Sequence, residues 1–170
     1  PPPTHSCELM PLLSLVTLLP IALGFVVAAM PQSASRMGAL VASVVVFVAS
    51  IPLWTGFDPA GAEYQFVEDL EWIAQWGVRY HLGIDGVSLC LILLTTAMTP
   101  LILLAGFSGV EKNFRGYAAL MLVLEGAMIG TFVALDTFLF YVFWELVLLP
   151  MYFLIGIWGG ERRIYAAVKL

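Results

Sequence analysis

The stretch from residue 138 to residue 158, FLFYVFWELVLLPMYFLIGIW, is apolar except for one acidic side chain, Glu145. A run of about 20 such residues is long enough to cross a bilayer as a helix. A charged side chain at that depth costs at least about 2.5–3.5 kcal/mol on insertion scales, so its presence indicates a function. The functions that suit it are a proton or ion path, a buried counter-ion and a binding site.

The whole chain is far more apolar than a soluble domain. Of its 170 residues 61% are hydrophobic and 11% are charged, and the mean hydropathy is +0.97. In soluble domains about half of the residues are apolar and about a quarter are charged. We therefore predict an all-α integral membrane protein that lies in a lipid bilayer. The formal charge of −5 is unevenly spread and does not indicate an acidic partner surface; no nucleic-acid partner is predicted.

Five apolar segments have the length of a membrane span. They cover residues 9–30, 37–56, 87–107, 117–135 and 138–158, and a sixth span is predicted to start near Ile164. Each is close to the ~20 residues that cross a hydrocarbon core of ~30 Å. The first lacks the basic start of a signal peptide, so a spanning helix is predicted there. Because Met10 resembles a natural start, residues 1–9 are interpreted as a leader, and residues 10–170 as the N-terminal fragment of a larger membrane protein.

The basic residues predict how these spans are oriented. They lie in alternate connections, which places those connections in the cytoplasm and the N-terminus outside; the residues are Arg36, Lys112, Arg115, Arg162, Arg163 and Lys169. A bacterial inner membrane is the expected location. The acidic and aromatic second connection, residues 57–86, is predicted to form a small extracytoplasmic cap. Within it, residues 79–86 are predicted to form a short strand closing with an Asp-Gly turn.

Two carboxylates are predicted near the middle of the bilayer. If the turn between the fourth and fifth spans lies near residue 135, Glu125 and Glu145 are both roughly 15 Å from the outer end of their helices. The sequence leaves open whether they face each other, as a proton carrier would require, or are separately hydrogen-bonded to other helices. Both are candidate relay residues. Pro150, five residues after Glu145, is predicted to interrupt the hydrogen bonding of the same helix.

Three further features bear on function. Lys169 either anchors the sixth span at the interface or lies within the membrane and passes protons to a carboxylate. Asp136 is predicted to cap the fifth helix. Cys7 and Cys90 fit neither a metal spacing nor a disulfide framework, and Cys90 is predicted to be a small core residue. With no nucleotide loop, metal-ligand cluster or nucleophile–base pair in the sequence, we expect no redox centre, cofactor or metal in this chain.

Three segments carry a family resemblance: YHLGIDGVSL at residues 80–89, ALDTFLFYVFWELVLLPMYFLIGIWGG at residues 134–160, and AAVK at residues 166–169. In that order they resemble a signature preceding the third helix, the fifth helix and the start of the sixth helix of one family. That family is the antiporter-like M subunits (NuoM) of respiratory complex I. The match extends over most of the chain from Met10 onward.

The resemblance implies that residues 10–170 are the N-terminal part of an antiporter-like membrane domain in a proton-translocating NADH:quinone oxidoreductase. It implies that Glu145 is the essential fifth-helix glutamate, which works with a lysine outside this chain. Lys169 matches a family lysine, and Glu125 lies where the family varies. NADH, FMN, iron–sulfur clusters and quinone would be bound by other subunits of the complex, the expected partners. A subunit of a cation/proton antiporter and a structural membrane scaffold are the alternatives.

Overall fold

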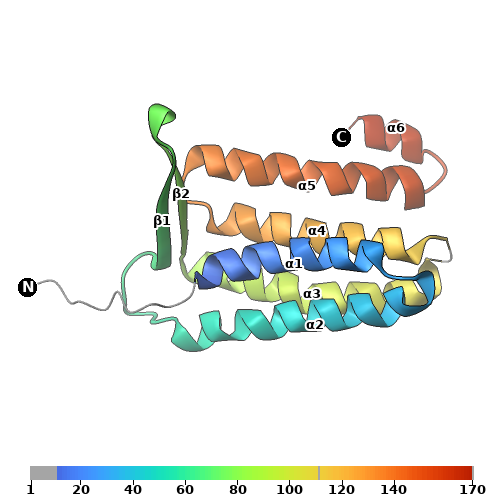
Figure 1. Ribbon diagram of the computed structural model, residues 1–170, viewed down its shortest axis with the longest axis horizontal. Coiled ribbons are helices and arrows are strands. Elements are labelled where there is room, and N and C mark those ends of the chain that lie inside the picture. Colours follow the sequence, from blue (N-terminus) through green and yellow to red (C-terminus); the bar gives the residue numbers. More distant parts are fainter. Residues whose placement is uncertain (1–10, 111, 170) are drawn as a thin grey trace, which may run out of the picture.

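Five long helices run up and down to form a bundle, with a two-stranded hairpin standing across one end (Figure 1). The computed structural model describes residues 11–110 and 112–169, so the leader assigned to residues 1–9 and Cys7 lie outside the described residues. The elements are α1 (Leu12–Ala29), α2 (Gln32–Gly56), β1 (Gln65–Ile73), η1 (Ala74–Trp76), β2 (Val78–Ile84), α3 (Gly86–Gly109), α4 (Phe114–Val133), α5 (Thr137–Trp158) and α6 (Arg163–Val168).

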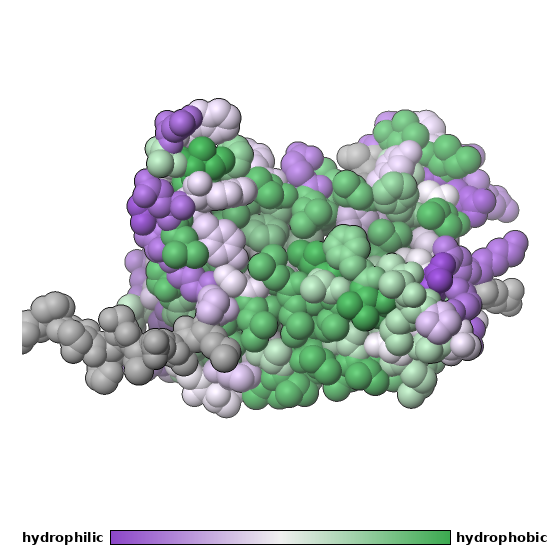
Figure 2. All heavy atoms as spheres, viewed as in Figure 1, coloured by the Kyte–Doolittle hydropathy of each residue, from purple (hydrophilic) through white to green (hydrophobic). Residues whose placement is uncertain are grey.

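The five long helices confirm the predicted membrane spans, since each is long and apolar enough to cross a bilayer. On the face seen in Figure 2, an apolar band lies between two polar ends of the bundle. Helix α2 begins at Gln32, five residues before the predicted start, because hydropathy marks only the apolar part of a helix that continues into a polar first turn. Helix α6 begins at Arg163, one residue before the predicted start of the sixth span.

The bundle surrounds α4, the most buried of the five long helices. Lipid tails are as apolar as leucine, so helices in a membrane associate through close packing at small residues. Gly126 and Gly130, four residues apart on α4, provide this contact. A Cβ atom at Gly126 would lie 2.7 Å from the carbonyl oxygen of Thr17 on α1, and one at Gly130 would collide with the ring of Phe143 on α5. These two glycines therefore bring α1 and α5 close to α4.

The outer faces of the helices are apolar as well. Cys90 on α3 is exposed, so the prediction that it is a core residue is wrong. The sequence could not separate the two environments, because a membrane protein presents apolar side chains both to its own core and to lipid.

Strand β2 is held between β1 and the connection from α4 to α5. The two strands pair antiparallel, with Asp69 opposite His81. On the other side of β2, the Leu135 N–H donates to the carbonyl oxygen of His81 at 2.9 Å, next to an isolated bridge between Leu82 and Ala134. The predicted strand at residues 79–86 is thus confirmed in its position. The hairpin partner β1 was not predicted, because its acidic residues resemble a solvated loop.

The Asp-Gly turn predicted at the end of this strand is wrong. Asp85 is instead the N-cap of α3, and its Oδ1 accepts a hydrogen bond of 2.7 Å from the Ser88 backbone N–H. Hydrogen bonds from Ser88, above all from its backbone N–H, lower the pKa of the Asp85 carboxyl. An aspartate before a long apolar run favours the cap, because the first N–H groups of a helix need acceptors.

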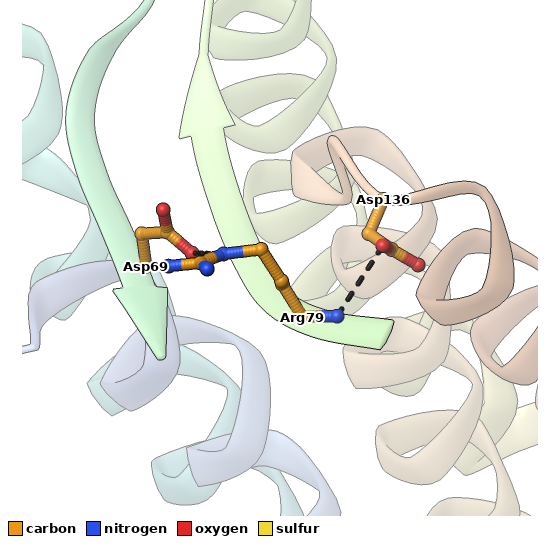
Figure 3. Close-up of polar contacts among 3 residues, drawn as sticks. All are labelled: Asp69, Arg79 and Asp136. Carbon is orange, nitrogen blue, oxygen red and sulfur yellow. Dashed lines mark hydrogen bonds and ion pairs between the residues drawn. The ribbon is translucent and has the colours of Figure 1, made fainter. Parts of the chain in front are cut away.

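Asp136 caps α5, as predicted. Its Oδ1 accepts hydrogen bonds from the backbone N–H groups of Phe138 and Leu139 at 2.8 and 3.1 Å. Its Oδ2 lies 3.4 Å from the backbone nitrogen of Arg79, whose guanidinium Nε pairs with Asp69 at 2.7 Å (Figure 3). The Leu139 N–H, together with the other donors, lowers the pKa of the Asp136 carboxyl. The α4–α5 turn is thereby attached to the hairpin.

Replacing Gly130 by alanine tests the packing around α4. We expect a loss of about 1–3 kcal/mol in the free energy of unfolding, because the new methyl group would overlap the Phe143 ring. Thermal unfolding in detergent would measure it. Gly109→Ala is the control, since a Cβ there meets no atom within 4 Å. Equal effects of the two substitutions would contradict this account of the packing.

The Asp136 cap predicts a pH dependence of stability. The pKa is lower in the folded state than its ordinary value of 3.8. The ionised cap therefore stabilises the fold fully above that value and loses its contribution as the pH falls through the folded-state pKa. Asp136→Asn keeps an acceptor for the N–H groups but should remove this acid-dependent part of the unfolding curve. Glu63→Gln, at an exposed position, should leave the curve unchanged.

Candidate functional site

Glu125 lies inside the bundle with its carboxylate unpaired. The side chain is only 2% exposed, and neither carboxylate oxygen has a hydrogen-bond partner among the described residues. It borders a cavity of about 280 Å³ between α3 and α4. The hydroxyl of Thr99, which lines the same cavity, donates to the carbonyl oxygen of Thr95 at 3.0 Å. A buried carboxylate without a partner is costly in a low-dielectric interior, so this position requires an explanation.

Glu145 occupies a different environment. It is exposed on α5, beside the exposed side chains of Tyr141 and Trp144. The side of α5 that packs on the bundle carries Leu139, Phe143 and Pro150. Contact of the Phe143 ring with Gly130 sets the rotation of α5, and this rotation turns Glu145 away from the other described helices.

The two glutamates do not face each other. Glu125 borders a cavity lined by residues of α3 and α4 alone, and Glu145 is not part of its lining. The sequence placed both at a similar depth but could not fix the helix rotation. The structure therefore gives the two carboxylates separate surroundings, and a shared proton between them has no geometric support within this chain.

Lys169 follows the short helix α6 at the end of the bundle opposite the hairpin (Figure 1). Its side chain is exposed, and its Nζ donates to the hydroxyl of Tyr165 at 3.0 Å while lying 5.2 Å from the centre of that ring. Across residues 11–110 and 112–169, the ion pair that forms is Arg79–Asp69. Lys169 therefore contacts neither candidate glutamate.

Glu68 has a structural role that the sequence analysis did not detect. From β1, its carboxylate accepts hydrogen bonds from the α1 backbone N–H groups of Leu13, at 2.8 Å, and Ser14, at 3.2 Å. It also accepts from the hydroxyl of Ser14, which lies 2.8 Å from the Tyr80 hydroxyl. Pro11, which precedes α1, supplies no side-chain cap. The available signal was the lack of a capping residue before the first helix, but sequence cannot indicate which distant acceptor replaces it.

Carboxylates thus occupy the N-termini of all three helices that begin at the hairpin end. Glu68, Asp85 and Asp136 accept hydrogen bonds from the first turns of α1, α3 and α5, respectively. A negative charge at this position is also favoured by the helix dipole. In the part of the chain that the structure describes, no group of three or more His, Cys, Asp or Glu side chains could hold a metal ion.

Comparisons with known proteins show that the chain is similar to membrane subunits of NADH-quinone oxidoreductase. Residues 134–170 match the family described as NADH:quinone oxidoreductase/Mrp antiporter, transmembrane. Subunit M of NADH-quinone oxidoreductase from Rhodobacter capsulatus is 46% identical over 165 residues, covering 93% of this chain and 32% of that protein. Over most of its length, the chain is similar to subunit M of NADH-quinone oxidoreductase. It spans about a third of the length of the curated relatives that it matches.

Solved structures of related membrane complexes share the fold of this chain. A chain of respiratory complex I from Thermus thermophilus with bound NADH aligns with a TM-score of 0.76 at 27% identity, covering 91% of this chain and 31% of that one. A chain of the Mrp complex from Dietzia sp. DQ12-45-1b aligns with a TM-score of 0.77 at 18% identity, covering 92% of this chain and 17% of that one. The second likeness establishes a shared fold.

The role of Glu68 can be tested by substitution. Glu68→Ala should lower the free energy of unfolding by about 0.5–2 kcal/mol, because the first N–H groups of α1 lose their acceptor. Amide hydrogen exchange in detergent should speed up at Leu13 and Ser14 and not at the centre of α1. Glu71→Ala is the matched control on the same strand, at an exposed position. Unchanged exchange in Glu68→Ala would refute the cap.

Proposed function

We propose that this chain works in a proton-translocating membrane subunit of NADH:quinone oxidoreductase, where Glu145 is part of a proton relay coupled to quinone reduction. The observation that carries the proposal is the position of Glu145. It lies in the middle of a membrane-length helix whose core-facing side is elsewhere. Because a carboxylate facing lipid is costly, its face of α5 needs a polar or basic partner from outside this chain. A lysine on a later helix of the whole subunit would meet that need.

The relay would act through an ion pair. A charge or conformational signal would close and open the pair between Glu145 and the lysine. Closing the pair favours the charged carboxylate, so Glu145 would release its proton, and opening the pair would let Glu145 take up another. Pro150 lies five residues after Glu145 and removes one backbone hydrogen bond from α5, which suits a helix that must admit water or adjust locally. Glu125 and Lys169 are secondary relay candidates, because neither contacts Glu145 here.

The proposal also covers the other subunits of the complex and the orientation of this chain in the membrane. Redox cofactors, NADH, FMN, iron–sulfur clusters and quinone, would be bound by other subunits of the complex. The basic connections α1–α2, α3–α4 and α5–α6 lie at the end opposite the hairpin (Figure 1). From the positive-inside rule we infer that this end is cytoplasmic and that the hairpin and the N-terminus face the extracytoplasmic side of a bacterial inner membrane.

A cation/proton antiporter subunit is the second candidate. It is favoured by the family description, which includes the Mrp antiporter, and by the fold shared with the Mrp complex. The higher identity to subunit M favours the oxidoreductase. A structural scaffold is the third candidate, in which the carboxylates within the spans only stabilise the packing of helices.

Glu145→Gln in the intact complex tests the relay. The substitution keeps the size and hydrogen bonding of the side chain but removes its exchangeable charge, so proton pumping and coupled quinone reduction should fall by about tenfold or more. Pumping would be measured in membrane vesicles with a pH-sensitive dye, and assembly by the yield of complete complex. Glu63→Gln is the control. Normal pumping would exclude the relay, whereas loss of assembly would favour the scaffold.

A further inference from the structure

We infer that the cavity between α3 and α4 receives a lysine or arginine side chain from a transmembrane helix outside this chain, with Glu125 as its ion-pair partner. This inference concerns how the chain binds its neighbours. It does not depend on the proposed relay, because it starts from a carboxylate that the relay does not require.

The first argument is the missing partner of Glu125. Both carboxylate oxygens are buried and make no hydrogen bond among the described residues, and no basic side chain lines the cavity. The basic side chains of the described residues lie in or next to the connections at the far end of the bundle, or in the hairpin, where Arg79 pairs with Asp69. A buried carboxylate that carries its charge is normally paired. An ionised Glu125 therefore requires a partner from outside the described residues.

The second argument is the shape of the cavity. Its volume of about 280 Å³ is several times the ~30 Å³ that one water molecule occupies in the liquid. It opens between exposed side chains on α3, since Leu94, Met98 and Ile102 are 54%, 47% and 40% exposed. These three residues are four apart, so they form a ridge along one face of the helix. A side chain of a neighbouring helix can enter beside this ridge.

The third argument is the chemistry of the lining. Apart from Glu125 and two threonines, the lining is apolar and includes Met98, Met121 and Met128. Lysine and arginine carry an apolar stem and a charged head. The stem would contact the methionines, which adapt readily to a partner's shape, while the head would reach the Glu125 carboxylate. A lipid acyl chain could cover the apolar ridge, but it would leave the carboxylate unpaired.

A photoreactive amino acid at position 98 in the intact complex, irradiated in native membranes, tests the inference. The expected product is an adduct with a peptide that carries a lysine or arginine within about one helical turn of the site of attachment. The same photoreactive residue at position 48, an exposed position on α2, is the control and should not give this peptide. Adducts with lipid alone, or with a helix that lacks such a basic residue, would overturn the inference.

A double-mutant cycle completes the test. Glu125→Leu should reduce the adduct yield by about tenfold or more, because the partner's charge is left buried and unpaired. Replacing the mapped basic residue by methionine should have a similar effect. The two substitutions together should restore most of the yield, since an apolar pair can replace a buried ion pair. A double variant no better than either single variant would exclude the ion pair. Proton pumping is not measured in this test, so failure of the relay would leave its result unaffected.

Discussion

Close packing around α4 is the constraint on which the rest of this bundle depends. Apolar side chains gain little by leaving lipid for a protein interior, so the helices need contacts that lipid cannot match. Gly126 lets the backbone of α1 approach and Gly130 accepts the ring of Phe143. Together they fix the distance of two neighbours from α4 and the rotation of α5. The exposed position of Glu145 on α5 follows from that rotation.

The second determinant of the fold is the hydrogen bonding of the free N–H groups at the helix starts, and the hairpin organises it. Three helices begin beneath it, and each finds a carboxylate for its first N–H groups. Two of these carboxylates are local caps, while Glu68 reaches α1 from β1. Strand β2 also pairs with the α4–α5 connection through His81 and Leu135. One small element therefore joins the starts of α1, α3 and α5, although these segments are far apart in the chain.

The two membrane glutamates differ because the packing separates them. Glu125 faces α3 and is enclosed, whereas Glu145 lies on the open side of α5. Each lacks a charged partner among the described residues, yet the missing partners would approach from different directions. The proposed relay and the proposed docking site would therefore use different faces of the bundle.

The sequence by itself determined the fold class, the five spans, the helix cap at Asp136 and the likeness to subunit M, because these depend on hydropathy, local hydrogen bonding and short motifs. It also singled out Glu145 and Glu125, since charges within apolar runs are conspicuous. Only the tertiary structure decided that these glutamates do not face each other, that Cys90 lies on the outside and that Glu68 caps α1. Helix rotation and contacts across more than fifty residues arise from packing between segments, and hydropathy along the chain does not encode which of two apolar faces is turned inward.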